Sequence, residues 1–483
     1  MVMTFSRKRL GYVGAGVSAA LCFSGLGVAT LAAPASPLSA SQAAFRPGSP
    51  GLGDPYFPRE GNGGYNVSHY DLKLTYIPQS HHLGGTATIT ATATQNLSRF
   101  DLDLTNYKIS SLTVNAVGAG FTRRGQELVV TPQSGLPKGR AFTVVVAYAG
   151  TPHTIRNSPI VFGAPYGWIF TKDGAFVGCE PNAAHTWYPS NDHPSDKATF
   201  RFDITVPTGT QVVANGDRTG GSSSAGMDTF VWTESQPMAT YLATIGIGKW
   251  NFHNTKTAAG IPETVAVDPA LENQAESARV VKLTGDITDY WAKLFGRYPF
   301  SSTGGIVDNV PHIGFSLETQ TRPLYGFVPD QVTASHELAH QWFGDSLSVK
   351  TWQNIWLNEG FATFVSWVWA EHRGGRTTYA YAKRVFNSIG SGSSFWKQSI
   401  ADPKRNTMFS QAVYYRGAMT LASLRHRIGD QKFFQLMRTW ATEHRDGNVT
   451  TREFTNLASK VSGQNLERFF RTWLWKQAKP PGI

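Results

Sequence analysis

The sequence predicts an α+β protein, with an antiparallel β domain followed by a mainly helical domain. Segments in which apolar and polar residues alternate, such as "YDLKLTYI" and "TFRFDITVP", dominate the first half, and turn residues separate them at short spacing. After about residue 266, apolar residues recur mostly at helical spacing. The chain has 483 residues, of which 41% are hydrophobic, so it can supply cores for two domains.

Residues 1–42 are predicted to be a secretory signal peptide with its cleavage region. Arg7, Lys8 and Arg9 precede an apolar run rich in Gly and Ala, and small residues in "PASPLSASQAA" offer cleavage sites. The lesser alternative is an uncleaved membrane anchor, because the run is long enough to span a bilayer. We therefore expect a secreted, extracellular protein without stable membrane insertion after cleavage.

Charge and cysteine content restrict the classes of function. The formal net charge is +11, but no Lys/Arg-rich run follows the signal, so nucleic-acid binding is not indicated. Cys22 would leave with the signal, and Cys179 would then have no partner for an intramolecular disulfide. We expect Cys179 to be a buried structural residue rather than a nucleophile.

Residues 46–265 are predicted to form the all-β domain. Its first stretch, "FRPGSPGLGDPYFPREGNGG", is dense in Gly and Pro and is predicted to be an extended lead-in. The predicted strands are "YDLKLTYI", "GTATITATAT", "FDLDLT", "LTVNAV", "ELVVTP", "FTVVVAYAG" and "TFRFDITVP".

Residues 266–483 are predicted to form the mainly helical domain. Its first helix lies in "NQAESARVVKLTGDITDYWAKLFG" and stops at Gly296. A strand-and-loop segment, "GGIVDNVPHIGFSLETQ", interrupts the helices. Further helices are expected at about 332–344 and 355–373, and then in "YYRGAMTLASLRHRIG", "QKFFQLMRTWATEHR" and "TREFTNLASKVSG".

The segment "SHELAHQWFGD" has the spacing of a zinc site. His336 and His340 are four residues apart, so on a helix they share one face with Cβ atoms roughly 5–6 Å apart. Zinc in catalytic sites takes three protein ligands. Glu359 in "WLNEGFATF" lies near the start of the next helix and can supply the third ligand across an antiparallel helix pair. The sequence therefore predicts one Zn²⁺ per chain.

Glu337 lies on the flank of the histidine pair. Its carboxylate can reach a water on the metal and take a proton as that water attacks a carbonyl. The alternative, on these five residues alone, is a chance match on an ordinary helix. The workable spacing of Glu359 favours the zinc hydrolase.

The two segments "HELAHQWFGD" and "WLNEGFATF" closely resemble the boxes of the aminopeptidase N family, zinc metallopeptidases of the gluzincin group. The match covers His336, Glu337, His340, Asn358 and Glu359. The resemblance implies a saddle-shaped β domain and a thermolysin-like catalytic domain, with two His and one Glu as zinc ligands and Glu337 as general base. The chain stops soon after the catalytic helices, so we expect a two-domain, secreted bacterial-type member.

The stretch "VYYRGA" resembles the V-Y-x-K-G box of the same family. Tyr414 takes the tyrosine position, where the phenol stabilises the oxyanion, and Arg416 replaces the usual Lys. The chemistry agrees, because a phenol donor beside zinc can bind developing negative charge. Tyr415 is the competing residue for this role.

Two more stretches, "GCEPNAAHTWYPSNDHPSDKATF" and "HIGFSLETQTRP", match the family. The resemblance places Glu180 and Glu318 where glutamates contact the free amine of the substrate. It also implies that the Glu318 strand lies along the cleft edge. Around Glu318 the sequence departs from the usual G-A-M-E-N, which leaves the selectivity for the first substrate residue open.

These residues predict a zinc-dependent aminopeptidase that hydrolyses the N-terminal peptide bond of peptides with a free N-terminus. Two alternatives stay open. A thermolysin-like endopeptidase shares the ligands but needs no amine-binding carboxylates. A catalytically silent surface binding protein would use the β domain for adhesion.

Overall fold

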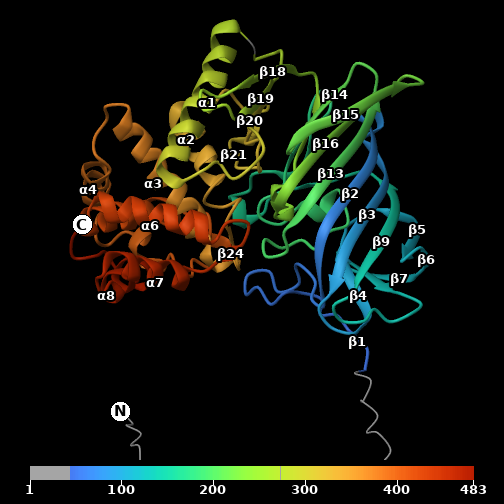
Figure 1. Ribbon diagram of the computed structural model, residues 1–483, viewed down its shortest axis with the longest axis horizontal. Helices are drawn as coiled ribbons and strands as arrows, with labels where there is room; N and C mark the ends of the chain where they lie inside the picture. The colour runs from blue at the N-terminus through green and yellow to red at the C-terminus, as the bar shows by residue number, and fades with distance from the viewer. Residues whose placement is uncertain (1–43, 272) are drawn as a thin grey trace, which may run out of the picture. The chain divides into compact units, whose positions relative to one another are not determined.

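The computed structural model describes residues 44–271 and 273–483, whose ribbon is shown in Figure 1. Residues 44–483 form one compact unit. The signal peptide predicted for residues 1–42 lies outside the described residues, so export stays a prediction. Within the described ranges, every helix is too short or too polar to cross a membrane.

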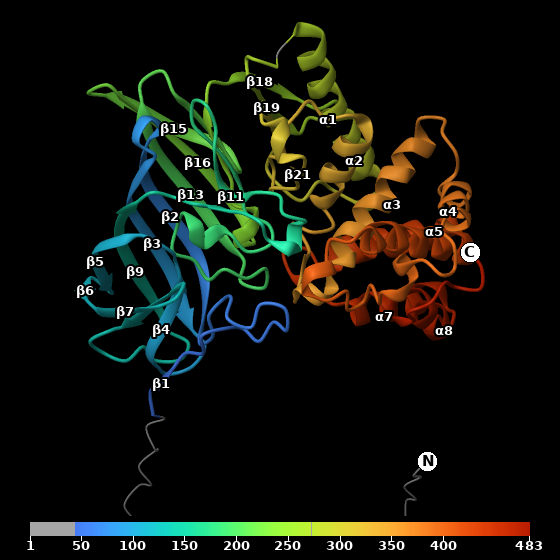
Figure 2. The ribbon, with the colours of Figure 1, turned by 180° about the vertical axis from the view of Figure 1, so that it is seen from behind.

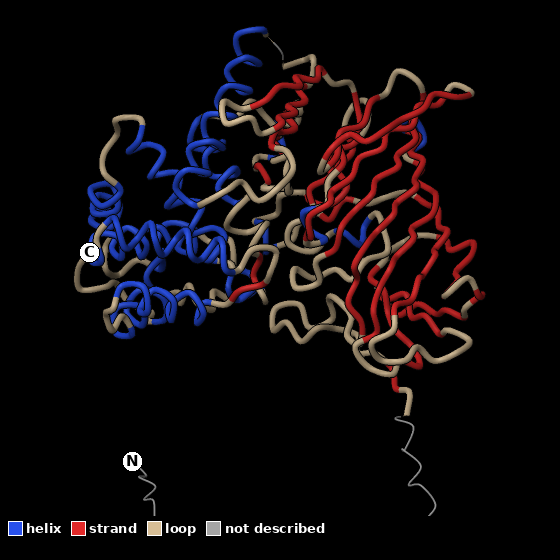
Figure 3. The backbone as a smooth tube through the Cα atoms, viewed as in Figure 1, coloured by secondary structure: helices blue, strands red, loops and turns tan. Residues whose placement is uncertain are grey.

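Strands gather in the first part of this unit and helices in the second, as Figure 3 shows, which confirms the predicted α+β class. One large sheet dominates the first part, with the strand order β15-β16-β13-β2-β3-β9-β5-β6. In that order its strands are Asp217–Ser224, Met227–Met238, Ala198–Pro207, Tyr65–Ile77, His82–Ala93, Ala141–Gly150, Lys108–Val114 and Val117–Gly118.

Alternation of side chains gives this sheet a buried face. In β13, Phe200, Phe202 and Ile204 are fully buried, while the residues between them are half-buried. Neighbouring strands are antiparallel as predicted, except that β13 runs parallel to β2. The alternation predicts a strand but not its neighbour, so this parallel pair could not be predicted from the sequence.

Two smaller sheets complete the β-rich part, which ends with β17. The first has the order β1-β4-β8-β7, with strands Arg46–Pro47, Leu97–Asp103, Glu127–Thr131 and Gly120–Arg124. The second has the order β10-β11-β12-β17-β14, with strands Thr154–Ile155, Tyr166–Phe170, Ala175–Gly178, Ile245–Gly248 and Gln211–Ala214. Strand β12 ends directly before Cys179, which is fully buried and free, as predicted.

The helical part begins with a five-stranded sheet of order β18-β19-β20-β22-β21. Its strands in that order are Asn251–Lys256, Pro262–Val267, Thr303–Val307, Leu324–Tyr325 and Ser316–Leu317. Strand β21 forms the edge of the sheet and ends directly before Glu318. The predicted domain boundary at residues 265/266 stays a prediction. Strand β19 spans this boundary and pairs with β18 before it and with β20 after it.

The helices begin and end close to the predicted positions. Helix α1 (Gln274–Phe295) is capped by the Asn273 side chain and ends at Gly296, whose φ of 99° suits glycine. Helices α4 and α8 were not predicted. The remaining helices are α2 (Gln331–His340), α3 (Trp356–His372), α4 (Thr378–Ser388), α5 (Gly417–Ile428), α6 (Asp430–Glu443), α7 (Thr451–Ser462) and α8 (Glu467–Phe470), with a short pair, β23 (Ser348–Val349) and β24 (Asn448–Val449).

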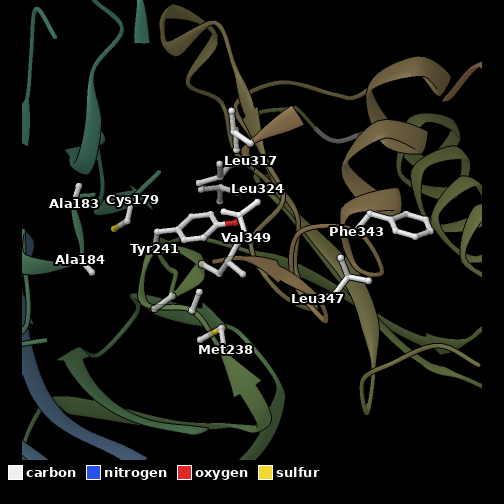
Figure 4. Close-up of a cluster of buried hydrophobic side chains, with 14 of the residues drawn as sticks. Cys179, Ala183, Ala184, Met238, Tyr241, Leu317, Leu324, Phe343, Leu347 and Val349 are labelled. Atoms are coloured by element: carbon white, nitrogen blue, oxygen red, sulfur yellow. The ribbon is translucent and has the colours of Figure 1, made fainter. Parts of the chain in front are cut away.

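One apolar core extends through the β-rich and helical parts. Figure 4 shows it where they meet: Tyr241 lies between Cys179 on one side and Leu317 and Leu324 on the other. Cys179 directly precedes Glu180, and Leu317 directly precedes Glu318. The shared core therefore fixes the backbone that carries these two glutamates.

The Gly- and Pro-rich lead-in is built into the junction, where Figures 1 and 2 show it as a blue loop. The buried carboxylate of Asp54 accepts hydrogen bonds from the Trp352 N–H (2.8 Å) and from His193 Nε2 (3.2 Å). The Tyr56 hydroxyl donates to Asp402 at 2.5 Å. The segment before the first long strand therefore ties the β-rich part to the helical part.

Candidate active site

Helices α2 and α3 carry the three predicted metal ligands. Nε2 of His336 lies 3.2 Å from Oε2 of Glu359 and 3.2 Å from Nε2 of His340. Nε2 of His340 is 3.6 Å from the same Glu359 oxygen. The donor atoms therefore converge on one point, since all three lie within 4.8 Å of one another.

This donor set fits one zinc ion. Two imidazole nitrogens and one carboxylate oxygen are a common set of three ligands at catalytic zinc. Nδ1 of His340 lies 3.1 Å from the carbonyl oxygen of Phe343, so Nδ1–H donates to it and the lone pair of Nε2 faces the cluster. A cation between Nε2 of His340 and Nε2 of His336 would relieve the repulsion between two lone pairs.

Buried carboxyl groups give the site a strong preference for positive charge. The buried ones belong to Glu318, Glu337, Asp345 and Glu359, and the half-buried Glu180 adds a fifth. Burial and mutual repulsion raise the pKa of Glu180 well above its usual range. Burial also acts to raise the pKa of Glu359, but the neighbouring histidines lower it to about 2. A metal cation and a substrate ammonium would both be stabilised here.

Glu337 and Tyr414 lie beside the ligands. Ligand atoms of Glu337, Glu318 and His340 are within 4.8 Å of one another. The ring of Tyr414 stacks on His336 with a centroid distance of 6.0 Å and an interplanar angle of 16°. The competing Tyr415 instead packs near Trp367, with a centroid distance of 6.2 Å.

Tyr414 lies in a π-helical turn, Ala412–Arg416, that leads into α5. Such turns often occur at functional sites, and the sequence did not predict this one. Arg416 ends the turn, and its side chain is fully buried. Its guanidinium donates to the carbonyl oxygens of Trp396, Gln398, Thr472, Trp473 and Lys476.

The two predicted amine-binding glutamates come together beside the metal ligands. Carboxylate oxygens of Glu180, Glu318 and Glu359 lie within 4.8 Å of one another. The Tyr241 hydroxyl donates to Glu318 at 3.4 Å. Among the described residues, no donor reaches Oε1 of Glu180, although that atom is buried. The Glu180 carboxylate therefore has an oxygen that can still accept from a cationic donor.

Two positioning residues were missed by sequence reasoning. The Gln341 side chain donates to the Glu318 carbonyl (3.1 Å) and to Asp345 (2.7 Å), and accepts from the Thr321 N–H (2.7 Å). It directly follows His340, so its place within the zinc box was an available signal. Tyr241 lies about a hundred residues earlier, and nothing in its local sequence marked it.

A cavity of about 480 Å³ opens beside His336, Glu337 and Tyr414. Residues of α2, α3 and the segment that connects α3 to α4 form its wall. A substrate whose reacting bond lies at the metal ligands can therefore extend into this space.

Two histidines and a glutamate that converge from packed helices, with a further glutamate beside them, define the class of single-zinc hydrolase sites. The chain belongs to peptidase family M1: the Peptidase M1 N-terminal domain matches residues 66–242, and the Peptidase family M1 domain matches residues 330–473.

Curated relatives are similar over much of this chain. Aminopeptidase N of Lactococcus lactis is 26% identical over 326 residues, which cover 61% of this chain and 38% of that protein. Leucyl aminopeptidase of Saccharolobus solfataricus is 25% identical over 409 residues, which cover 78% of this chain and 50% of that protein. The chain therefore spans half or less of the length of these relatives.

Solved structures of similar length also match. The M1 zinc metallopeptidase of Deinococcus radiodurans superposes with a TM-score of 0.80 at 28% identity, covering 90% of this chain and 99% of that one. A mutant of that enzyme bound to the substrate Tyr-Ser-Ala superposes with a TM-score of 0.79 at 27% identity, covering 90% of this chain and 100% of that one.

Proposed function

We propose that this protein is a zinc-dependent aminopeptidase that hydrolyses the N-terminal bond of peptides with a free amino terminus. The observation that carries the proposal is the convergence of Glu180 and Glu318 on the metal ligand Glu359. A carboxylate oxygen without a donor, next to a second carboxylate and beside a hydrolytic metal site, suits a substrate ammonium.

The two glutamates would determine which peptide bond is cleaved. Glu180 and Glu318 hold the ammonium group next to the metal ligands, so only the first peptide bond reaches the reacting position. A blocked, neutral N-terminus would leave the buried Glu180 oxygen unpaired, which costs about 1–3 kcal/mol for a neutral group and more for a charged one. Peptides with acetylated N-termini should therefore be poor substrates.

His336, His340 and Glu359 would hold one zinc ion per chain. Bound zinc would polarise the scissile carbonyl and activate a water molecule. Glu337 takes the proton of the attacking water and delivers it to the leaving nitrogen. Burial raises the pKa of Glu337 well above its usual range, which makes its carboxylate a stronger proton acceptor than an exposed one.

Tyr414 would stabilise the oxyanion of the tetrahedral intermediate. Burial and the nearby carboxylates of Glu359, Glu180 and Glu318 raise the pKa of its phenol well above the usual range. The phenol therefore keeps its proton at neutral pH and donates a hydrogen bond to the developing negative charge.

The similar proteins support this substrate class. The curated relatives are named as aminopeptidases, and the tripeptide Tyr-Ser-Ala is the substrate in the Deinococcus radiodurans complex. A thermolysin-like endopeptidase would have no use for Glu180 and Glu318. A silent binding protein would have no use for Glu337 beside the ligands.

A substrate panel tests the proposal. Aminoacyl chromogenic substrates, free and N-acetylated, are assayed with and without a chelator, and bound zinc is measured by mass spectrometry. We expect hydrolysis of the free substrates only, with loss of activity on chelation. Equal hydrolysis of acetylated peptides would support the endopeptidase, and stoichiometric zinc without hydrolysis would support the binding protein.

We also propose, from the sequence of residues 1–42 alone, that the protein is exported and that its signal is removed. N-terminal sequencing of the protein from the culture medium tests this. Recovery of an uncleaved chain from the membrane fraction would support the anchor instead.

A further inference from the structure

The cavity beside Glu337 and Tyr414 is lined by a positively charged side chain, Arg376, that has no part in the proposed function. Arg376 lies on the connection between α3 and α4 and lines this cavity with an exposed side chain. Among the described residues, neither a carboxylate nor another polar group pairs with its guanidinium. The one acid of the described cavity wall is Glu337, at the catalytic end.

The acid nearest to Arg376 in sequence is already engaged. The Glu371 carboxylate accepts from Nη1 of Arg425 at 2.7 Å and from the Thr378 N–H at 3.0 Å. These contacts also fix the connection that carries Arg376, since they tie the end of α3 and the start of α4 to α5. Arg373, on the same connection, has its guanidinium over the ring of Trp369, 5.8 Å from its centroid.

The wall between the catalytic residues and Arg376 is largely apolar. Val332 is 60% exposed and Tyr381 is 38% exposed, both unusually high for large hydrophobic side chains, and Trp367 adjoins them. Exposed apolar groups gathered in one cavity favour an apolar ligand group there.

We propose that Arg376 binds the C-terminal carboxylate of di- and tripeptides, so that the protein prefers short peptides with a free C-terminus. The inference rests on the proposed aminopeptidase function, because that function places the substrate N-terminus at Glu180 and Glu318. The residues beyond the cleaved bond then extend past Glu337 into the cavity. The planar guanidinium matches a carboxylate with two parallel hydrogen bonds.

Chain length explains why short peptides are preferred. Each extended residue spans at most about 3.3–3.6 Å, so one or two residues beyond the cleaved bond bring a carboxylate about 4–7 Å into the cavity. A longer peptide presents a neutral peptide group there instead. An apolar side chain on the second residue would pack against Val332 and Trp367.

The test compares peptides that have a free C-terminal carboxylate with the same peptides amidated at the C-terminus. For wild type, we expect kcat/KM for Leu-Phe to exceed that for Leu-Phe-NH2 by about 5- to 50-fold. The substitution Arg376→Gln should bring this ratio close to one, and Arg376→Glu should invert it. Arg373→Gln is the matched control on the same connection and should keep the wild-type ratio. Unchanged melting temperature and zinc content exclude misfolding as the cause.

Binding tests the inference even without turnover. In a Glu337→Gln background, titration calorimetry should show that Leu-Phe binds more tightly than Leu-Phe-NH2, and that Arg376→Gln removes this difference. Equal binding of acid and amide to the Glu337→Gln protein would overturn the carboxylate site. Absence of hydrolysis of every free aminoacyl substrate by wild type would instead overturn the proposed function, so the two failures are distinguishable.

Discussion

Gly360 and Gly417 touch through their backbones where α3 crosses the start of α5. A Cβ atom on Gly360 would lie 2.9 Å from Cα of Gly417, and a Cβ atom on Gly417 would lie 2.6 Å from Cα of Gly360. Gly360 directly follows Glu359, and Gly417 lies three residues after Tyr414. The absence of two side chains therefore lets the backbone that carries Glu359 come close to the backbone that carries Tyr414.

The substitution Gly360→Ala should separate these helices. We expect it to reduce stability by about 1–3 kcal/mol, as overpacking does, and to reduce kcat by more than it alters KM. Chemical denaturation and steady-state kinetics measure the two effects. Gly392→Ala is the control, because a Cβ there meets no atom within 4 Å. Wild-type kcat in Gly360→Ala would show that the close contact is not needed for catalysis.

Gln341 should act on substrate binding through Glu318. The substitution Gln341→Met keeps the volume but leaves the Thr321 N–H and the Glu318 carbonyl without their partner, at a cost of about 1–3 kcal/mol in stability. A displaced Glu318 should raise KM for free aminoacyl substrates while zinc content stays at the wild-type value. An unchanged KM with a lower melting temperature would mean that the role is only structural.

Removing the metal should destabilise the protein as well as inactivate it. The buried carboxylates repel one another without a cation, and ligand binding to the folded state contributes about 4 kcal/mol when free zinc exceeds its Kd a thousandfold. We expect a chelator to lower the melting temperature and added zinc to restore it. The melting temperature of the Glu359→Ala variant should change neither with the chelator nor with added zinc. A chelator-sensitive melting temperature in this variant would place the ion elsewhere.

Asp54 should contribute stability that depends on pH. Burial acts to raise its pKa, but hydrogen bonds from His193, Trp352 and Tyr56 outweigh it and lower the pKa below the ordinary value of 3.8. Because the folded-state pKa is the lower one, this contribution is present above pH 3.8 and is lost as pH falls through the folded-state pKa.

The substitution Asp54→Asn should therefore lower the free energy of unfolding most at neutral pH, by about 1–3 kcal/mol. The difference from wild type should shrink as the pH falls below about 4. Denaturant unfolding at several pH values measures it. A difference that stays constant down to pH 2 would contradict the lowered pKa.

Local spacing predicted the parts of this site that lie on single elements. His336 and His340 share a helix face because they are four residues apart, and period-two alternation predicted most of the large sheet. The neighbours of an element could not be predicted in this way. The parallel pairing of β13 with β2 and the hydrogen bond from Tyr241 to Glu318 join segments far apart in the chain.

The Gly- and Pro-rich lead-in is a second case in which the local structure was predicted but the long-range contacts were not. Its Gly and Pro residues correctly predicted a segment without a long strand. They did not predict that the Asp54 carboxylate would accept a hydrogen bond from the Trp352 N–H. Family resemblance supplied Glu180, Glu318 and Tyr414, whose local sequences carry no chemical signal of their own.

The buried guanidinium of Arg416 links the turn that carries Tyr414 to a segment about sixty residues later in the chain. Three of its five carbonyl acceptors belong to residues 472–476, and the side chain of a lysine has too few donors to satisfy all five. A chain still emerging from the ribosome cannot hold the turn of Tyr414 in place until those residues arrive. His336, His340 and Glu359 are thus synthesised well before the residues that hold the turn of Tyr414 in place.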